Sequence, residues 1–322
     1  MLIAAAAAGV LSRAPTWARQ GRRPYRVGVL SRDTFFAMPT DWSAFVDELS
    51  RLGYVDGRNL IFDIRPAAAK DDLDRLALEL VNAAVDVIFA FGGTPIAVAA
   101  KRATPAIPIV FYYSPDPVGY GLVRSFAHPG TNLTGTALPV SETLRKNVQI
   151  LAQATGKLSR VAVIHPAQPD WLASQRSFSA SISDAARRLG IQVQFVKVDA
   201  FTELAATMEA LVREGIGGVI SLGVAELPRA FFDELARLLV NLRLPSVGEP
   251  ESGFLLSYGY SASDLAQRAA RYVGKVLKGS KPADLPVEQV TTFELVINLR
   301  TARAIGLSIP SDVLIQATRL IQ

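Results

Sequence analysis

The feature that most constrains this chain is a regular alternation of short apolar runs with longer amphipathic segments. The alternation starts at Arg26 and runs in two rounds, which are separated near residues 137–141. Short β-branched runs predict buried strands, and apolar residues at helical spacing predict helices. Repeated strand–helix units are typical of parallel sheets covered by helices on both faces. The pattern predicts strands at 26–30, 59–64, 86–91, 108–113, 133–138, 160–165, 192–198, 217–223 and 244–248, and helices at 39–53, 71–83, 94–103, 141–154, 170–190, 201–215 and 225–242. For 117–127 it predicts either a helix or a turn followed by a helix.

We therefore predict an α/β protein made of two doubly wound parallel-sheet lobes. Lobe 1 is expected over residues 26–137 and lobe 2 over 138–253. The length of 322 residues fits about two domains, and a hydrophobic content of 50% is enough for two packed cores. If the lobes face each other, the carboxyl ends of both sets of strands border one ligand cleft.

The charge distribution argues against nucleic acid as a partner. The net charge is +5, but the basic residues are scattered over polar helix faces and form no stripe interleaved with aromatic residues. The chain also has no cysteine, which excludes disulfides, thiol nucleophiles and Cys-ligated zinc.

The N-terminal 23 residues form a predicted leader. Residues 2–11 are an apolar run too short to span a bilayer, and small residues that suit a cleavage site follow it. This resembles a secretory signal peptide and predicts a periplasmic protein. No basic residue precedes the run, so either the signal is clipped by the chosen start or the segment is an Ala-rich helix.

The sequence contains little that could perform catalysis. It has two histidines, His128 and His165, and none of the motifs of zinc proteases, serine hydrolases, P-loop nucleotide-binding proteins or dinucleotide-binding proteins. We expect no enzyme activity, no metal and no cofactor, and a small molecule as the ligand.

Polar residues that follow the predicted strands suit binding. Thr94 begins a helix, where free amides and its hydroxyl could hold a carboxylate, although a plain helix cap explains it as well. Asp116 could hold an amine or cap its own turn. Alternation along 108–113 predicts that one of Tyr112 and Tyr113 faces the core and the other a helix or the cleft mouth. Together these groups suit an amino acid. The candidate ligand residues are Ser31, Thr34, Gly93, Thr94, Pro95, Ser114 and Asp116 in lobe 1, and His165, Gln168, Asp170, Gly223 and Glu249 in lobe 2.

At these residues the chain resembles a known family. The stretches "FGGTPIAVAAKRAT" (91–104), "DPVGYGLVRSFAHPGTNLTG" (116–135) and "YVGKVLKGSKPADLPVEQVTTFELVINLRTARAIGLSIP" (272–310) are similar to the substrate-binding proteins of ABC transporters in the tryptophan/tyrosine-type group, which have the type 1 periplasmic binding-protein fold. The resemblance extends from about Arg26 to the C-terminus.

The resemblance implies a non-catalytic, monomeric receptor that closes two lobes around a small ligand and delivers it to a permease in the inner membrane. It also implies three crossings between the lobes, which form a multi-strand hinge. We therefore expect "GFLLSYG" (253–259) to be the return hinge, 254–286 to return to lobe 1, and 287–322 to belong to lobe 2.

One stretch departs from the family. Where the family has Asn-Pro-x-Asn-Pro after a strand of the second lobe, this chain has "HPAQP", with His165 and Gln168 in place of the two asparagines. This difference lies where ligand specificity would be set. The alternative to a transport receptor is a cytoplasmic α/β ligand sensor or an enzyme on the same two-lobe architecture.

Overall fold

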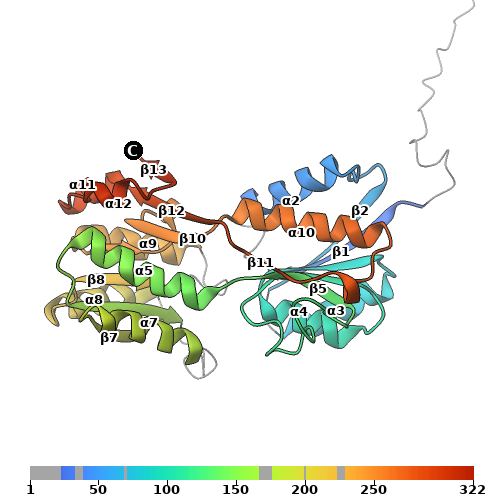
Figure 1. The fold of residues 1–322 in the computed structure, drawn as a ribbon, viewed down its shortest axis with the longest axis horizontal. Helices are drawn as coiled ribbons and strands as arrows, with labels where there is room; N and C mark the ends of the chain where they lie inside the picture. Colours follow the sequence, from blue (N-terminus) through green and yellow to red (C-terminus); the bar gives the residue numbers. More distant parts are fainter. Residues whose placement is uncertain (1–22, 33–38, 69–70, 167–175, 199–200, 223–228) are drawn as a thin grey trace, which may run out of the picture.

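Two sheets, each covered by helices on both faces, form two lobes that lie side by side (Figure 1). The structure is a computed structural model that describes residues 23–32, 39–68, 71–166, 176–198, 201–222 and 229–322. Within this part of the chain, no helix is long and apolar enough to cross a membrane. The α/β fold with two parallel-dominated lobes, as predicted, is confirmed.

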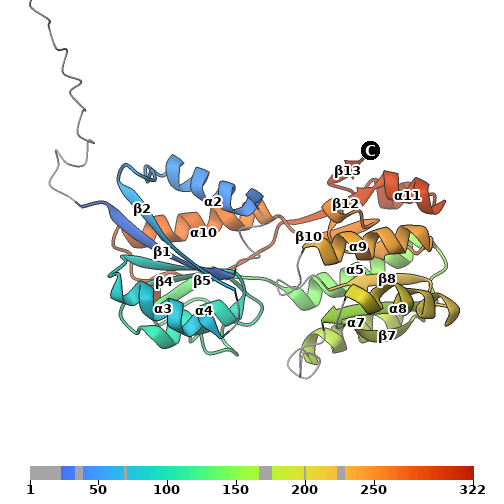
Figure 2. The ribbon, with the colours of Figure 1, turned by 180° about the vertical axis from the view of Figure 1, so that it is seen from behind.

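Lobe 1 is built on a fully parallel sheet in the order β11-β5-β4-β3-β1-β2. Helices α2 and α10 cover one face, and α3 and α4 cover the other (Figures 1 and 2). The strands are nearly continuous apolar runs because both faces are buried. The elements are β1 Tyr25–Arg32, α2 Pro39–Arg51, β2 Leu60–Ala67, α3 Asp72–Asn82, β3 Val87–Phe91, α4 Thr94–Ala103, β4 Ile109–Ser114, β5 Leu133–Ala137, α10 Ala262–Leu277, η3 Pro282–Asp284 and β11 Glu288–Gln289.

Lobe 2 is built on a sheet in the order β13-β12-β10-β9-β8-β6-β7, in which the β10–β12 pair is antiparallel. Helices α5, α7, α11 and α12 pack on one face, and α8 and α9 on the other. The elements are α5 Val140–Thr155, β6 Arg160–Pro166, α7 Arg176–Arg188, β7 Gln192–Val198, α8 Phe201–Arg213, β8 Gly218–Ser221, α9 Arg229–Asn241, β9 Ser246–Val247, η2 Pro250–Ser252, β10 Leu256–Tyr260, β12 Phe293–Asn298, α11 Leu299–Ile305, α12 Ser311–Leu314 and β13 Arg319–Ile321.

The chain crosses between the lobes later than we expected from the sequence. Strand β10 pairs with β9 and β12, so residues 256–260 belong to lobe 2, and the return to lobe 1 follows Tyr260. Strand β11 pairs with β5 in lobe 1, so the last crossing lies between Gln289 and Phe293. An apolar run predicts a strand but does not show which sheet it joins, which is why both boundaries move by several residues.

The predicted helix at 117–127 is instead a series of turns. Gly121 adopts a left-handed φ of +66°, which ends any helical path. The amides of Tyr120 and Leu122 donate to the carbonyl oxygens of Asp116 and Pro117, which closes two turns at the edge of lobe 1.

Candidate functional site

The carboxyl ends of the strands of both lobes point toward the other lobe, except those of β12 and β13, which run in the opposite direction (Figure 1). Register pairs Ser31 of β1 with Phe91 of β3, and Phe111 of β4 with Ala90, so Ser31, Phe91 and Tyr112 lie in one row across lobe 1. Paired residues in a sheet point to the same face, and this face is the one that α2 and α10 cover. Ligands of open parallel sheets bind beyond this edge.

Two predicted residues, Thr94 and Ser114, are joined by a hydrogen bond. Their hydroxyl oxygens lie 2.9 Å apart, although they follow different strands, and both side chains are buried. The helix cap is Gly93, whose extended backbone precedes α4, while Thr94 is its first residue and Pro95 the next. Thr94 is therefore not the cap that the sequence suggested, because its hydroxyl is engaged by Ser114.

A chain of tyrosines extends from the lobe 1 core to the second crossing. Tyr112 is 1% exposed, and its hydroxyl lies 2.9 Å from Oδ2 of Asp41 and 3.3 Å from the carbonyl oxygen of Ala262. The rings of Tyr112 and Tyr113 lie 5.7 Å apart, and those of Tyr113 and Tyr260 6.3 Å apart. As alternation predicted, Tyr112 faces the core and Tyr113 is only half-buried. Tyr113 also lies against Gly93: a Cβ added to Gly93 would be 3.3 Å from the hydroxyl of Tyr113.

Asp41, in the first turn of α2, is the buried carboxylate of this cluster. It is 6% exposed, and burial raises its pKa, while the hydrogen bond from Tyr112 partly opposes that shift. Burial also raises the pKa of Tyr112 well above its usual range, and the Asp41 charge adds to it.

Glu249 approaches the same cluster from lobe 2. Burial raises its pKa, as do the charges of Glu251 and Asp41, and Arg229 opposes the shift. The carboxyl group remains accessible to solvent although surrounding protein raises its pKa, the combination expected on the wall of a concave surface. Tyr260 shows the same combination: it is 36% exposed, and burial raises its pKa well above its usual range, followed by the effects of Tyr113, Glu249 and Asp41. The Asp41 charge of lobe 1 thus acts on both Glu249 of lobe 2 and Tyr260.

Of the other predicted ligand residues, some are buried, one is exposed and four lie outside the described part of the chain. Ser31 is fully buried, and its hydroxyl has no hydrogen-bond partner among the described residues. His165 is buried at the end of β6, between β7 and β8. Asp116 is exposed, and its Oδ1 accepts a hydrogen bond of 2.8 Å from the amide of Gly119, which is the local cap that the sequence left open. Thr34, Gln168, Asp170 and Gly223 lie outside the described residues.

A hollow of about 450 Å³ spans the two lobes beside the first crossing. Asp116 and Tyr120 line it from lobe 1, and Arg145 and Phe178 from lobe 2. Its volume is within the range of small-molecule sites. The full lining is Pro115, Asp116, Gly119, Tyr120, Pro139, Val140, Ser141, Glu142, Arg145 and Phe178.

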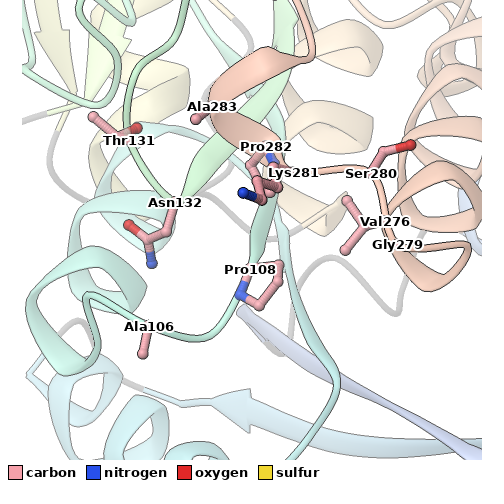
Figure 3. A pocket seen from close by; sticks show the side chains of 10 residues that line it. All are labelled: Ala106, Pro108, Thr131, Asn132, Val276, Gly279, Ser280, Lys281, Pro282 and Ala283. Carbon is pink, nitrogen blue, oxygen red and sulfur yellow. The ribbon is translucent and has the colours of Figure 1, made fainter.

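A second hollow, of about 330 Å³, lies away from the cleft (Figure 3). It is bordered by Pro108 and Asn132, just before β4 and β5 begin, and by Lys281 and Pro282 after α10. This is the amino edge of the lobe 1 sheet, opposite to the edge where ligands bind in parallel sheets. We therefore place the candidate site between the lobes and not here.

Sequence reasoning missed Asp41, Tyr260 and Arg145. A carboxylate in the first turn of a helix is favoured there by the helix dipole alone, so Asp41 carries no distinctive signal. Tyr260 ends an apolar strand, and Arg145 occupies a polar helix position. Among the described residues, no group of three or more His, Asp or Glu side chains could hold a metal ion.

Comparison with known proteins gives consistent matches. A family model described as "ABC transporter substrate binding protein" matches residues 36–321. The Tyrosine-binding protein of Clostridioides difficile (strain R20291) is 27% identical over 270 residues, which cover 82% of this chain and 75% of that protein. A conserved domain protein from Vibrio cholerae O1 biovar El Tor has a crystal structure that is 26% identical with a TM-score of 0.80, and the match covers 92% of this chain and 100% of that one. The structure of an ABC domain from Streptococcus pneumonia in complex with L-Trp is 22% identical with a TM-score of 0.78, over 92% of this chain and 100% of that one, and it shows the fold alone.

Proposed function

The chain belongs to the family of ABC transporter substrate-binding proteins, and from that premise we propose that it captures an amino acid or a small aromatic carboxylate by closing its two lobes. The relatives named for tyrosine and bound to L-Trp support an aromatic amino acid as the ligand. Family membership also favours a transport receptor over a cytoplasmic sensor or an enzyme.

The observation that carries the proposal is the meeting of two lobes around one polar and aromatic cluster. Tyr113 of lobe 1 contacts Tyr260 of the crossing, and Asp41 interacts electrostatically with Glu249 of lobe 2. A ligand that contacts both walls stabilises the closed arrangement, because those contacts exist only when the lobes approach. The buried hydroxyls of Thr94 and Ser114 provide a polar group on the lobe 1 wall.

The proposed setting follows from the family. Substrate-binding proteins of ABC transporters act outside the cytoplasm, and we place this one in the periplasm, exported by residues 1–23 as a leader. We propose that it acts as a monomer, with an inner-membrane permease as its partner. Residues Thr34, Gln168, Asp170 and Gly223, which lie outside the described residues, remain proposed ligand contacts.

A thermal-shift screen of the chain from Arg23 onward tests the proposal. The panel comprises the amino acids, aromatic acids, small carboxylates, sugars and nucleosides, and the protein is first unfolded and refolded to remove bound ligand. A ligand at 100 times its Kd stabilises the folded state by ~2.7 kcal/mol, a shift of a few degrees at this size. Shifts confined to aromatic amino acids or aromatic acids would support the proposal, and shifts confined to sugars or nucleosides would contradict it.

A further inference from the structure

Asp41 is a buried carboxylate without a compensating cation. Its Oδ2 accepts a hydrogen bond of 2.9 Å from the hydroxyl of Tyr112, and the residue is 6% exposed. The causes of its raised pKa include no basic side chain. Burying a carboxylate beside one neutral donor lowers the stability of the fold. A role in binding would explain why the chain has a carboxylate at this position.

Two acidic groups among the described residues interact electrostatically with Asp41. Glu249 and the phenol of Tyr260 interact electrostatically with it from the opposite wall and the crossing. The nearest cation that acts on Glu249 is Arg229, whose Nε is bonded to Asp233 on its own helix. The described part of the cluster is therefore complementary to a positively charged group.

A separate feature points to a ligand at this place. The hydroxyl of Ser31 is fully buried and lacks a partner among the described residues. Ser31 faces the α2 side in the same row as Phe91 and Tyr112. The ring of Trp42, next to Asp41, lies 6.0 Å from the ring of Phe91, so the first turn of α2 packs over that row. The unpartnered hydroxyl of Ser31 and the turn that carries the Asp41 carboxylate thus lie over the same row of lobe 1.

We propose that Asp41 is the specificity-determining carboxylate of the cleft and binds the primary ammonium group of the ligand, with Glu249 contributing from the opposite lobe. The inference rests on the proposed receptor function and narrows it: the ligand is an amino acid and not a simple aromatic acid. Asp41 lies on lobe 1, so it binds the ammonium in the open state, and Glu249 adds its attraction as the lobes close. The buried Tyr112 beside Asp41 excludes water from that carboxylate and strengthens its attraction for the ammonium group.

The test uses two matched ligand pairs and two carboxylate variants. Affinity is measured calorimetrically for L-tyrosine against 3-(4-hydroxyphenyl)propionate, and for L-tryptophan against indole-3-propionate, which differ only in the ammonium group. We expect wild-type protein to prefer the amine-bearing member by about tenfold to a hundredfold. In Asp41→Asn this preference collapses through weaker binding of the amine-bearing ligand, while binding of the des-amino acid changes little.

A ligand-free measurement separates a binding role from a structural one. Asn at position 41 can still accept the hydrogen bond from Tyr112, and it removes a buried charge, so the Tm at pH 7 should stay unchanged or rise. The control is Asp72→Asn, which removes a first-turn carboxylate that pairs with Arg75 on α3 and lies outside the cleft. We expect this control to leave the ligand preference unchanged.

Each outcome tests either the role of Asp41 in binding the ammonium group or the proposed receptor function. Equal affinity of wild-type protein for both members of the pairs would overturn the role of Asp41 and leave the receptor function intact. An unchanged preference in Asp41→Asn, or a ligand-free Tm that falls further than in Asp72→Asn, would overturn it as well. If wild-type protein binds none of the four compounds, the aromatic-ligand proposal itself fails, and the Tm comparison still decides whether Asp41 is structural.

Discussion

The two lobes present different surfaces to the cleft, although both are parallel-dominated sheets under helices. On lobe 1 two pairs of buried polar groups are already bonded to one another: Thr94 to Ser114, and Tyr112 to Asp41. On lobe 2 the corresponding group, Glu249, is exposed, and the charges of Glu251, Arg229 and Asp41 act on it. The difference indicates that lobe 1 is the preorganised wall that receives the ligand and lobe 2 the wall that closes on it.

The largest effect should come from disturbing the strand that carries the lobe 1 wall. Gly135 of β5 has φ +159°, and an added Cβ would lie 2.2 Å from the carbonyl oxygen of Phe111 on β4. A backbone atom cannot yield without separating the strands, so we expect Gly135→Ala to lower the free energy of unfolding by about 3 kcal/mol. Strand β4 also carries Tyr112–Ser114, so ligand affinity should fall as well.

The matched control is a glycine on a strand of lobe 2. Gly259 of β10 has open space where a Cβ would lie, so Gly259→Ala should change stability by less than about 0.5 kcal/mol. Urea denaturation measures both variants. Equal losses would show that the two sheets tolerate backbone crowding alike.

A smaller effect is expected from the bonded hydroxyls of lobe 1. Ser114→Ala leaves the hydroxyl of Thr94 buried without its partner, which should cost about 1–3 kcal/mol. Thr94→Val should cost a similar amount, and the double variant less than the sum, because no polar group is then left unpaired. A double-mutant cycle by urea denaturation measures the coupling, and strict additivity would argue that the hydroxyl pair contributes nothing as a pair.

The smallest effect concerns Glu249 of lobe 2. Its folded-state pKa is raised above the usual 4.5, so the stability linked to its proton is present at pH below about 4.5 and is lost as pH rises through the raised pKa. Glu249→Gln removes this loss, so the variant should gain stability relative to wild type between pH 4 and 7. The gain should stay under about 1 kcal/mol because solvent screens this exposed group.

Glu234 of α9 provides the control of opposite sign. The hydrogen bond from Arg237 lowers its pKa, so its contribution is present at higher pH and is lost as pH falls. Glu234→Gln should therefore lose stability relative to wild type as pH rises over the same range. Thermal melts at several pH values measure the stability of both variants relative to wild type. If the two differences changed with pH in the same direction, the opposite pKa shifts of Glu249 and Glu234 would be contradicted.

The local elements were largely predictable, and the places where prediction failed share a cause. The sequence predicts helix α4 at the residues where the structure has it, because Pro95 and the apolar spacing act within one segment. It predicts a helix at 117–127 that the structure replaces with turns, because Gly121 takes a conformation that apolar spacing does not report. Thr94 is not the cap of α4, because its hydroxyl bonds to that of Ser114. Ser114 lies twenty residues further along the chain, so the local pattern around Thr94 does not reveal this bond.

The sequence by itself determined the class of fold, the two rounds of strand and helix, and the edge of the sheets at which ligand residues gather. Each of these depends on periodicity and on the order of segments along the chain. Only the tertiary structure decided that β10 belongs to lobe 2, that Asp41 lies against Tyr112 and that its charge acts on Glu249. Those facts depend on pairing and packing between segments that are between about 40 and 210 residues apart, where burial and lost hydration change the properties of ordinary side chains.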